Sequence, residues 1–287
     1  MTSSPDVGAF ARLRAAGFVC AATRLADVDL PRLGYTIGVG EDEIHAVLDV
    51  ETAGGGFDAL KRPKILFEPH VFYRNLSGAA RTQAVSLGLA YAKWKPGAYP
   101  RDSYPRLMQA LSIDETAALK ACSWGLGQIL GENHVAAGYH TPQAMVEAFC
   151  QGGETEHLAA MIRFIVANKL DDELRRHDWA GFARGYNGPQ YAANGYDRKL
   201  AAAFAKWSRI KDTPWSPSEV EPVPDPLAPM GAGADPVLQK AAQNMPAPML
   251  KPAPTGGLSS APSPAPAAPG FWSRLLSTIR LNLAKGA

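Results

Sequence analysis

Cysteine is scarce in this chain, whose 287 residues include only Cys20, Cys122 and Cys150. An odd number of widely spaced cysteines does not make the disulfide framework of a small secreted domain. We therefore expect buried free thiols. The chain also lacks Cys-x-x-Cys and His-x-x-x-His patterns, so the sequence predicts neither a metal site nor a cofactor.

Excess charge and long apolar runs are missing as well. The 29 basic and 27 acidic residues leave a formal net charge of +2, which does not predict a nucleic-acid binder. No run approaches the roughly 20 apolar residues of a membrane span. Residues 1–6 contain no basic region followed by an apolar stretch, so we expect synthesis in the cytoplasm without a Sec signal peptide.

Composition changes sharply after about Lys211. Most of the 24 prolines lie between Pro214 and Pro269, in segments rich in alanine. Such segments cannot bury enough apolar surface to form a core. The sequence therefore predicts a folded domain over residues 1–211, a disordered Pro/Ala-rich linker over 212–270 and a short helix over 271–287.

The predicted terminal helix is cationic and amphipathic. Its apolar face carries Trp272, Leu275, Leu276, Ile279 and Leu283, and its positive charges are Arg274, Arg280 and Lys285. This pattern is typical of helices that contact anionic membrane or lipopolysaccharide. A helix that docks on a partner or folds back on the main domain is an equal alternative.

Within residues 1–211 the periodicity is mostly helical. Helices are predicted over 42–51, 83–93 and 154–169, among others, while Ile65–Glu68 is a short apolar run that is either a strand or a buried turn. Because strand signals are few and short, the predicted fold class is mostly α with a small β element.

Glu51 is the strongest candidate for chemistry. It ends an apolar helix, and the glycines Gly54–Gly56 follow at once. Desolvation at such a junction raises the pKa of a carboxyl group, as a general acid near neutral pH requires. A glutamate is mildly disfavoured at a helix C-terminus, so its presence there asks for a reason. The alternative is an exposed helix end that happens to precede glycines.

A second carboxyl group, Glu68, lies 17 residues later between Phe67 and Pro69. It is a candidate to position water or to stabilise an oxocarbenium-like transition state. The alternative is a buried structural glutamate that pairs with Arg62, Lys64 or Arg74. His70 is either a site residue or, more simply, a hydrogen-bonded histidine beside the site.

Two further segments have features of a sugar-binding surface. Trp124, Gly125 and Gln128 form a glycine turn suited to donating hydrogen bonds to sugar hydroxyls. Tyr186 and Asn187 combine an aromatic face with an amide, which suits stacking on sugar rings and binding hydroxyls. The alternatives are an ordinary turn and core packing.

Taken in order, four segments resemble the N-acetylmuramidase domain of phage endolysins. They are Val50–Phe57, Arg62–Phe72, Ser123–Ile129 and Phe182–Gly188, within a resemblance that covers roughly residues 25–210.

The resemblance implies a lysozyme-like fold that cleaves the β-1,4 bond between N-acetylmuramic acid and N-acetylglucosamine in peptidoglycan. It implies two glutamates that match Glu51 and Glu68, with Thr52 at a substrate-contacting position where serine is usual. Because we expect no Sec signal peptide, such an enzyme would reach the periplasm or cell wall through a holin, a phage particle or an injection device, and a monomer is the default expectation. A lytic transglycosylase and a catalytically inactive wall-binding phage protein remain alternatives.

Overall fold

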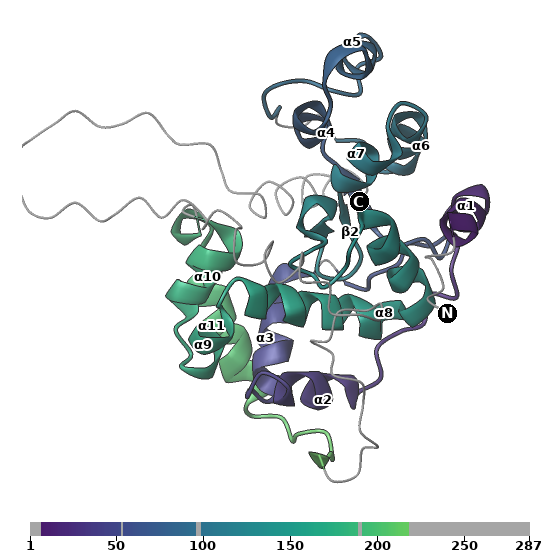
Figure 1. Cartoon of the computed structure of the whole chain (residues 1–287). Helices are drawn as coiled ribbons and strands as arrows, with labels where there is room; N and C mark the ends of the chain where they lie inside the picture. Colours follow the sequence, from purple (N-terminus) through teal and green to yellow (C-terminus); the bar gives the residue numbers. More distant parts are fainter. Residues whose placement is uncertain (1–6, 53, 96–98, 189–190, 218–287) are drawn as a thin grey trace, which may run out of the picture.

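The computed structural model describes residues 7–52, 54–95, 99–188 and 191–217 (Figure 1). Most of the predicted linker and the whole predicted helix over 271–287 lie outside these residues. Among the described helices, none is long and apolar enough to cross a membrane.

Helices make up most of the described chain. They are α1 (Val7–Ala15), α2 (Asp29–Tyr35), α3 (Glu41–Glu51), α4 (Pro69–Asn75), α5 (Gly78–Ser86), α6 (Tyr104–Leu111), α7 (Glu115–Lys120), α8 (Pro142–Ala167), α9 (Asp171–Arg175), α10 (Trp179–Asn187) and α11 (Tyr196–Trp207), with short 3-10 turns at Gly131–Asn133 and Ala192–Asn194. In Figure 1, α4 to α7 lie together above the small sheet, and α2, α3 and α9 to α11 lie below it.

The sheet has three short antiparallel strands in the order β1 (Ile65–Phe67), β2 (Cys122–Trp124) and β3 (Ile129–Leu130). Ile65 pairs with Trp124, and Trp124 pairs with Ile129. β2 and β3 are joined by the glycine turn, Gly125–Gln128. The predicted fold class, mostly α with a small β element, is confirmed.

One apolar core connects the two groups of helices. It includes Ile44 and Val47 of α3, Phe67 of β1, Leu107 of α6 and Leu158 of α8. α3 packs against both α2 and α11, so the helix that carries Glu51 is held by elements from distant parts of the chain.

α8 is the longest helix and it is kinked. Gly153 has φ 64° and ψ −155°, a conformation that favours glycine, and the helix resumes at Glu154. The predicted helix over 154–169 is therefore the second half of a longer element. Thr141 begins the first half by accepting a hydrogen bond from Ala144 N at 3.0 Å, which is an ordinary N-cap.

The predicted helix over 83–93 is wrong in its bounds. α5 ends at Ser86 because Gly88 takes a left-handed conformation with φ 70°. Gly88 N donates to Val85 O, and Leu89 N donates to Ala84 O, which together form a Schellman cap that terminates the helix.

The expectation of three free thiols is also wrong. Cys20 and Cys150 form a disulfide across 130 residues of sequence, with their Cα atoms 5.1 Å apart, whereas Cys122 is free and buried. The segment after α1 runs along the kink of α8, where Glu154 N donates to Thr23 O at 2.9 Å. The spacing of the cysteines along the sequence gives no indication that these two segments lie close together in the fold.

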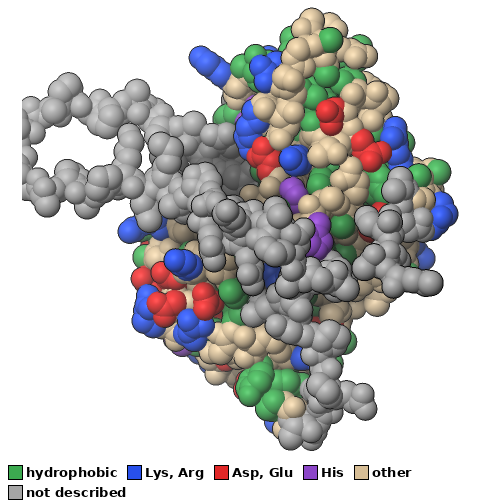
Figure 2. Space-filling model, viewed as in Figure 1, with side chains coloured by type: hydrophobic (Ala, Val, Ile, Leu, Met, Phe, Trp, Pro, Cys, Tyr) green, Lys and Arg blue, Asp and Glu red, His purple; other side chains and the backbone are tan. Residues whose placement is uncertain are grey.

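The surface over α9 is charged but locally balanced. Figure 2 shows acidic and basic side chains next to one another in this region. Arg175 pairs with Asp171 at 2.7 Å, and Arg176 pairs with Asp172. These exposed pairs neutralise each other and contribute little to stability.

Candidate active site

Glu51 lies at the buried end of α3. The helix places Ile44, Val47 and Val50 on its buried face and ends at Glu51, because Thr52 is extended at φ −108° and ψ 144°. The Thr52 hydroxyl donates back to Leu48 O at 2.8 Å. Only 1% of Glu51 is exposed, so the alternative of an exposed helix end does not describe this residue.

The carboxyl group of Glu51 has one hydrogen-bond donor among the described residues. Asn187 Nδ2 donates to Glu51 Oε1 at 2.8 Å, and Oε2 has no hydrogen-bond partner there. Burial raises the pKa of Glu51 to about 7, against the opposing effects of the Asn187 hydrogen bond and the charge of Lys199. At neutral pH the group is therefore partly protonated and can both give and take a proton.

Tyr186 lies next to this carboxyl group. It is buried on α10, where its ring stacks on Phe182 with centroids 5.3 Å apart. Burial and the nearby charge of Glu51 raise the pKa of Tyr186 well above its ordinary value. Two residues that the sequence selected separately, Glu51 and Asn187, are thus in direct contact, and Tyr186 lies close enough to interact with the same carboxyl group.

Glu68 occupies the junction between β1 and α4. Its backbone N donates to Ala121 O at 2.8 Å, and 1% of the residue is exposed. Tyr99 Oη donates to Glu68 Oε2 at 2.5 Å, and His70 Nδ1 lies 3.3 Å from the same oxygen. Oε1 of Glu68 has no hydrogen-bond partner among the described residues.

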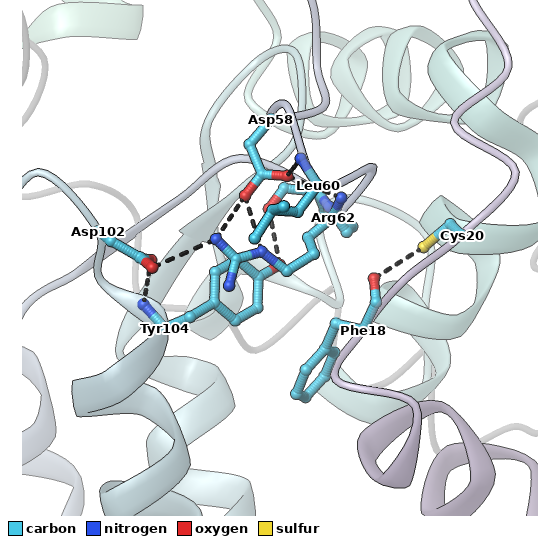
Figure 3. A network of polar contacts seen from close by, with 8 residues as sticks. Phe18, Cys20, Asp58, Leu60, Arg62, Asp102 and Tyr104 are labelled. Carbon is cyan, nitrogen blue, oxygen red and sulfur yellow. Dashed lines mark hydrogen bonds and ion pairs between the residues drawn. The ribbon is translucent and has the colours of Figure 1, made fainter.

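The arginines considered as partners for Glu68 bind other carboxylates. Arg62 Nε donates to Asp58 at 2.8 Å, its Nη2 lies 3.3 Å from Asp102, and its guanidinium lies over the ring of Tyr104 (Figure 3). Arg74 pairs with Glu132. The ion-pair alternative for Glu68 therefore finds no support from either arginine.

The turn between β2 and β3 is held by its own side chains. Gly125 has φ 67° and Gln128 has φ 48°. Gln128 Nε2 donates to Gly125 O at 2.8 Å and to Lys64 O at 3.2 Å. Trp124 is fully buried and donates from Nε1 to Leu119 O at 3.0 Å, so its ring supports the turn from the core side.

The glycine loop, Gly54–Gly56, connects these parts. Lys64 N donates to Gly56 O at 2.8 Å, and Gly125 N donates to Lys64 O at 2.8 Å. The loop after Glu51, the start of β1 and the glycine turn are therefore joined by backbone hydrogen bonds. β1 then leads directly to Glu68.

Three residues of this region were not selected from the sequence. Tyr99 donates a hydrogen bond to Glu68. Glu154 and His157 of α8 contact the glycine loop and the glycine turn. The sequence feature that could have drawn attention to Glu154 is its position directly after Gly152 and Gly153.

Among the described residues, no group of three or more His, Cys, Asp and Glu side chains is arranged to hold a metal ion. The chemistry that the described side chains offer is proton transfer between buried carboxyl groups and a substrate.

The chain was compared with known proteins. Residues 41–208 match the model of the N-acetylmuramidase family. A comparison with curated protein sequences found no match. Among solved structures, the crystal structure of an endolysin from the Burkholderia phage AP3 is similar, with a TM-score of 0.61 and 39% sequence identity over 69% of this chain and 76% of that chain.

The family match spans the elements that carry the site. The family match includes Glu51, Glu68, the glycine turn and Asn187, and the structural match extends over more than two thirds of the chain. The chain therefore belongs to the N-acetylmuramidase family, which confirms the predicted family, the glycoside-hydrolase class and the action on peptidoglycan.

Proposed function

We propose that Glu51 is the general acid that cleaves the β-1,4 bond between N-acetylmuramic acid and N-acetylglucosamine. The observation that carries this assignment is the buried carboxyl group whose pKa is raised to about 7. A general acid works best when its pKa lies near the working pH, because it must hold a proton and also release it.

In the proposed reaction, Glu51 gives its proton to the glycosidic oxygen as the bond to the muramic acid carbon breaks. A water molecule supplies the new oxygen at that carbon. In an inverting reaction Glu68 takes up the proton of this water, and in a retaining reaction Glu51, which has already given up its own proton, takes it up. Glu68 stabilises the positive charge that develops on the sugar. The hydrogen bond from Tyr99 occupies Oε2, and Oε1 has no hydrogen-bond partner among the described residues.

The remaining predicted residues are assigned to substrate binding. Asn187 and Tyr186 lie around Glu51, and His70 lies beside Glu68. Backbone groups of the glycine turn, with Thr52 at the start of the glycine loop, are the proposed hydrogen-bond partners of sugar hydroxyl and N-acetyl groups. Trp124 contributes through its packing beneath the turn.

The test is mass spectrometry of soluble fragments released from purified peptidoglycan. We expect reducing N-acetylmuramic acid ends with one water added for each cut. Anhydro ends would instead identify a lytic transglycosylase, and binding without release would identify an inactive wall-binding protein. Glu51→Gln should abolish release while keeping the fold, and Glu115→Gln on α7 is the control that should keep full activity.

The C-terminal part is assigned from sequence alone. We propose that the cationic segment 271–287 contacts anionic membrane or lipopolysaccharide, and that 212–270 is a linker that lets it reach the surface. The protein then acts as a monomer on the cell wall after delivery by a holin, a phage particle or an injection device. Binding to anionic vesicles with and without residues 218–287 tests this assignment.

A further inference from the structure

One turn of α8 faces both glycine segments of the site. The kink at Gly153 redirects the helix so that Glu154 and, three residues later, His157 lie on the same side. Glu154 contacts the glycine loop after Glu51, and His157 contacts the glycine turn. Both side chains are almost completely buried, at 2% and 1% exposure.

Glu154 uses both carboxylate oxygens on backbone groups. Oε1 accepts from Gly56 N at 2.6 Å, and Oε2 accepts from Leu25 N at 3.2 Å. Arg24 Nε lies 3.2 Å from Oε2 and supplies the compensating positive charge from a mostly exposed position. A buried carboxylate that is satisfied in this way fixes the loop more firmly than a neutral acceptor would.

His157 acts as a neutral acceptor. Leu126 N donates to its Nδ1 at 3.1 Å. Its ring lies between Phe57 and Phe149, with centroid distances of 4.8 and 4.3 Å. Burial lowers the pKa of His157 to about 3, so the ring is neutral near pH 7 and Nδ1 can act as an acceptor there.

The glycines that meet the buried ring of His157 are required by space. A Cβ atom on Gly55 would overlap Arg24 and lie 2.7 Å from Glu154 Oε1. A Cβ on Gly56 or Gly125 would overlap the ring of His157. The close approach of α8 thus explains why both segments are rich in glycine.

We propose that Glu154 and His157 are positioning residues that hold the glycine loop and the glycine turn in one arrangement around Glu51. This inference rests on the proposed function, because it assumes that Glu51 is the general acid. Glu154 touches no reacting atom. In this role it holds the loop that follows Glu51 against α8, while Lys64 N binds Gly56 O just before β1. We expect a loop held in this way to limit the access of water to the carboxyl group of Glu51.

A loosened loop should hydrate Glu51 and lower its pKa. Among the described residues, the groups that act on Glu51 are Asn187 and Tyr186 from α10 and Lys199 from α11, and we expect them to stay in place when Glu154 is changed. Glu154 itself faces Arg24 and Lys64. A shift of the alkaline limb of the plot of kcat against pH therefore reports whether the glycine loop has loosened.

The test compares Glu154→Ala and Glu154→Gln with the control Glu156→Ala. Glu156 lies on the same helix but binds Arg163 and Tyr139, away from both glycine segments. For Glu154→Ala we expect kcat to fall on the order of 10- to 100-fold with KM nearly unchanged, since a small displacement of reacting groups has effects of this size. The alkaline limb should move to lower pH by about one unit. Glu154→Gln keeps an acceptor for Gly56 N and should recover part of the lost kcat.

A structural readout accompanies the kinetics. Hydrogen exchange at residues 54–57 should accelerate in Glu154→Ala and stay at the wild-type rate in Glu156→Ala. A matched pair tests the second contact: His157→Asn keeps an acceptor near the position of Nδ1, whereas His157→Leu has similar bulk and none. We expect kcat to be higher in His157→Asn than in His157→Leu.

The outcomes separate the two claims. If wild-type protein released no reducing sugar ends, the proposed function and this inference would both fall. If wild-type protein is active and Glu154→Ala matches Glu156→Ala in kcat, in pH profile and in exchange at 54–57, the positioning role is refuted and the proposed function stands. If Glu154→Ala fails to fold, the same comparisons with Glu154→Gln and with the His157 pair decide the question.

Discussion

Glu51→Gln should make the protein more stable at alkaline pH while it removes activity. The folded state raises the pKa of Glu51 from 4.5 to about 7. Below 4.5 the carboxyl group is protonated in both the folded and the unfolded chain, so the folded state suffers no penalty. As pH rises from 4.5 to about 7, the unfolded chain releases this proton while the folded protein keeps it, so stability is lost over this range; above about 7 the folded protein buries the charge and the loss stays constant.

The size of the effect follows from the two pKa values. At 1.36 kcal/mol for each pH unit between 4.5 and about 7, the loss amounts to about 3 kcal/mol above neutral pH. Gln is close to a protonated Glu in shape, and its carbonyl oxygen can still accept from Asn187. For a domain of this size, such a difference corresponds to roughly 6–12 °C in Tm.

The assay is thermal unfolding of wild type and Glu51→Gln in parallel from pH 4 to pH 9. Groups that titrate in both proteins cancel in the difference, so the Tm gap should be near zero at pH 4, should grow between pH 4.5 and 7, and should be constant above. A Tm gap that does not depend on pH, or a variant that is less stable than wild type at pH 8.5, would refute the conclusion that burial raises the pKa of Glu51.

Three further predictions concern the same site and the tail. Asn187→Leu removes the donor that opposes the raised pKa of Glu51, so the alkaline limb of kcat should move to higher pH; a move to lower pH would contradict the assignment. Tyr99→Phe removes a hydrogen bond to the carboxylate of Glu68, and kcat should fall about tenfold or more while the alkaline limb stays in place; unchanged kcat would show that this contact does not matter. Truncation after Pro217 keeps all described contacts and should leave release from purified peptidoglycan unchanged, while binding to anionic vesicles is lost; retained vesicle binding would end the membrane hypothesis.

Local patterns were enough to predict the elements that carry the glutamates. The periodicity of residues 42–51 and the following glycines predicted α3 and its end, and the short apolar run at 65–68 contained β1. The helix α2 was not predicted, because Pro31 and Gly34 weaken its local signal. Its position is set by packing, since a Cβ on Gly34 would lie 2.9 Å from Gly40 O.

The contacts between distant residues could not be predicted in the same way. Asn187 and Glu51 were each selected for their own chemistry, but nothing local indicates that they share a hydrogen bond. The roles of Glu154 and Tyr99 depend on burial and on partners far away in the chain. The disulfide between Cys20 and Cys150 has the same cause, namely a tertiary approach without a sequence signature.

The long sequence separation between Glu51 and its partner also affects when the enzyme becomes active. Asn187 follows Glu51 by 136 residues, and α11, which packs on α3, comes later still. At typical translation speeds of about 5–20 residues per second, roughly 7–27 seconds pass between the synthesis of these two residues. During that interval α3 has no α10 or α11 to cover it, so its terminal carboxyl group is hydrated and keeps an ordinary acidity. If Glu51 is the proton donor, as we propose, a nascent chain should be inactive toward sugar polymers until α10 and α11 dock on α3 and bury this carboxyl group.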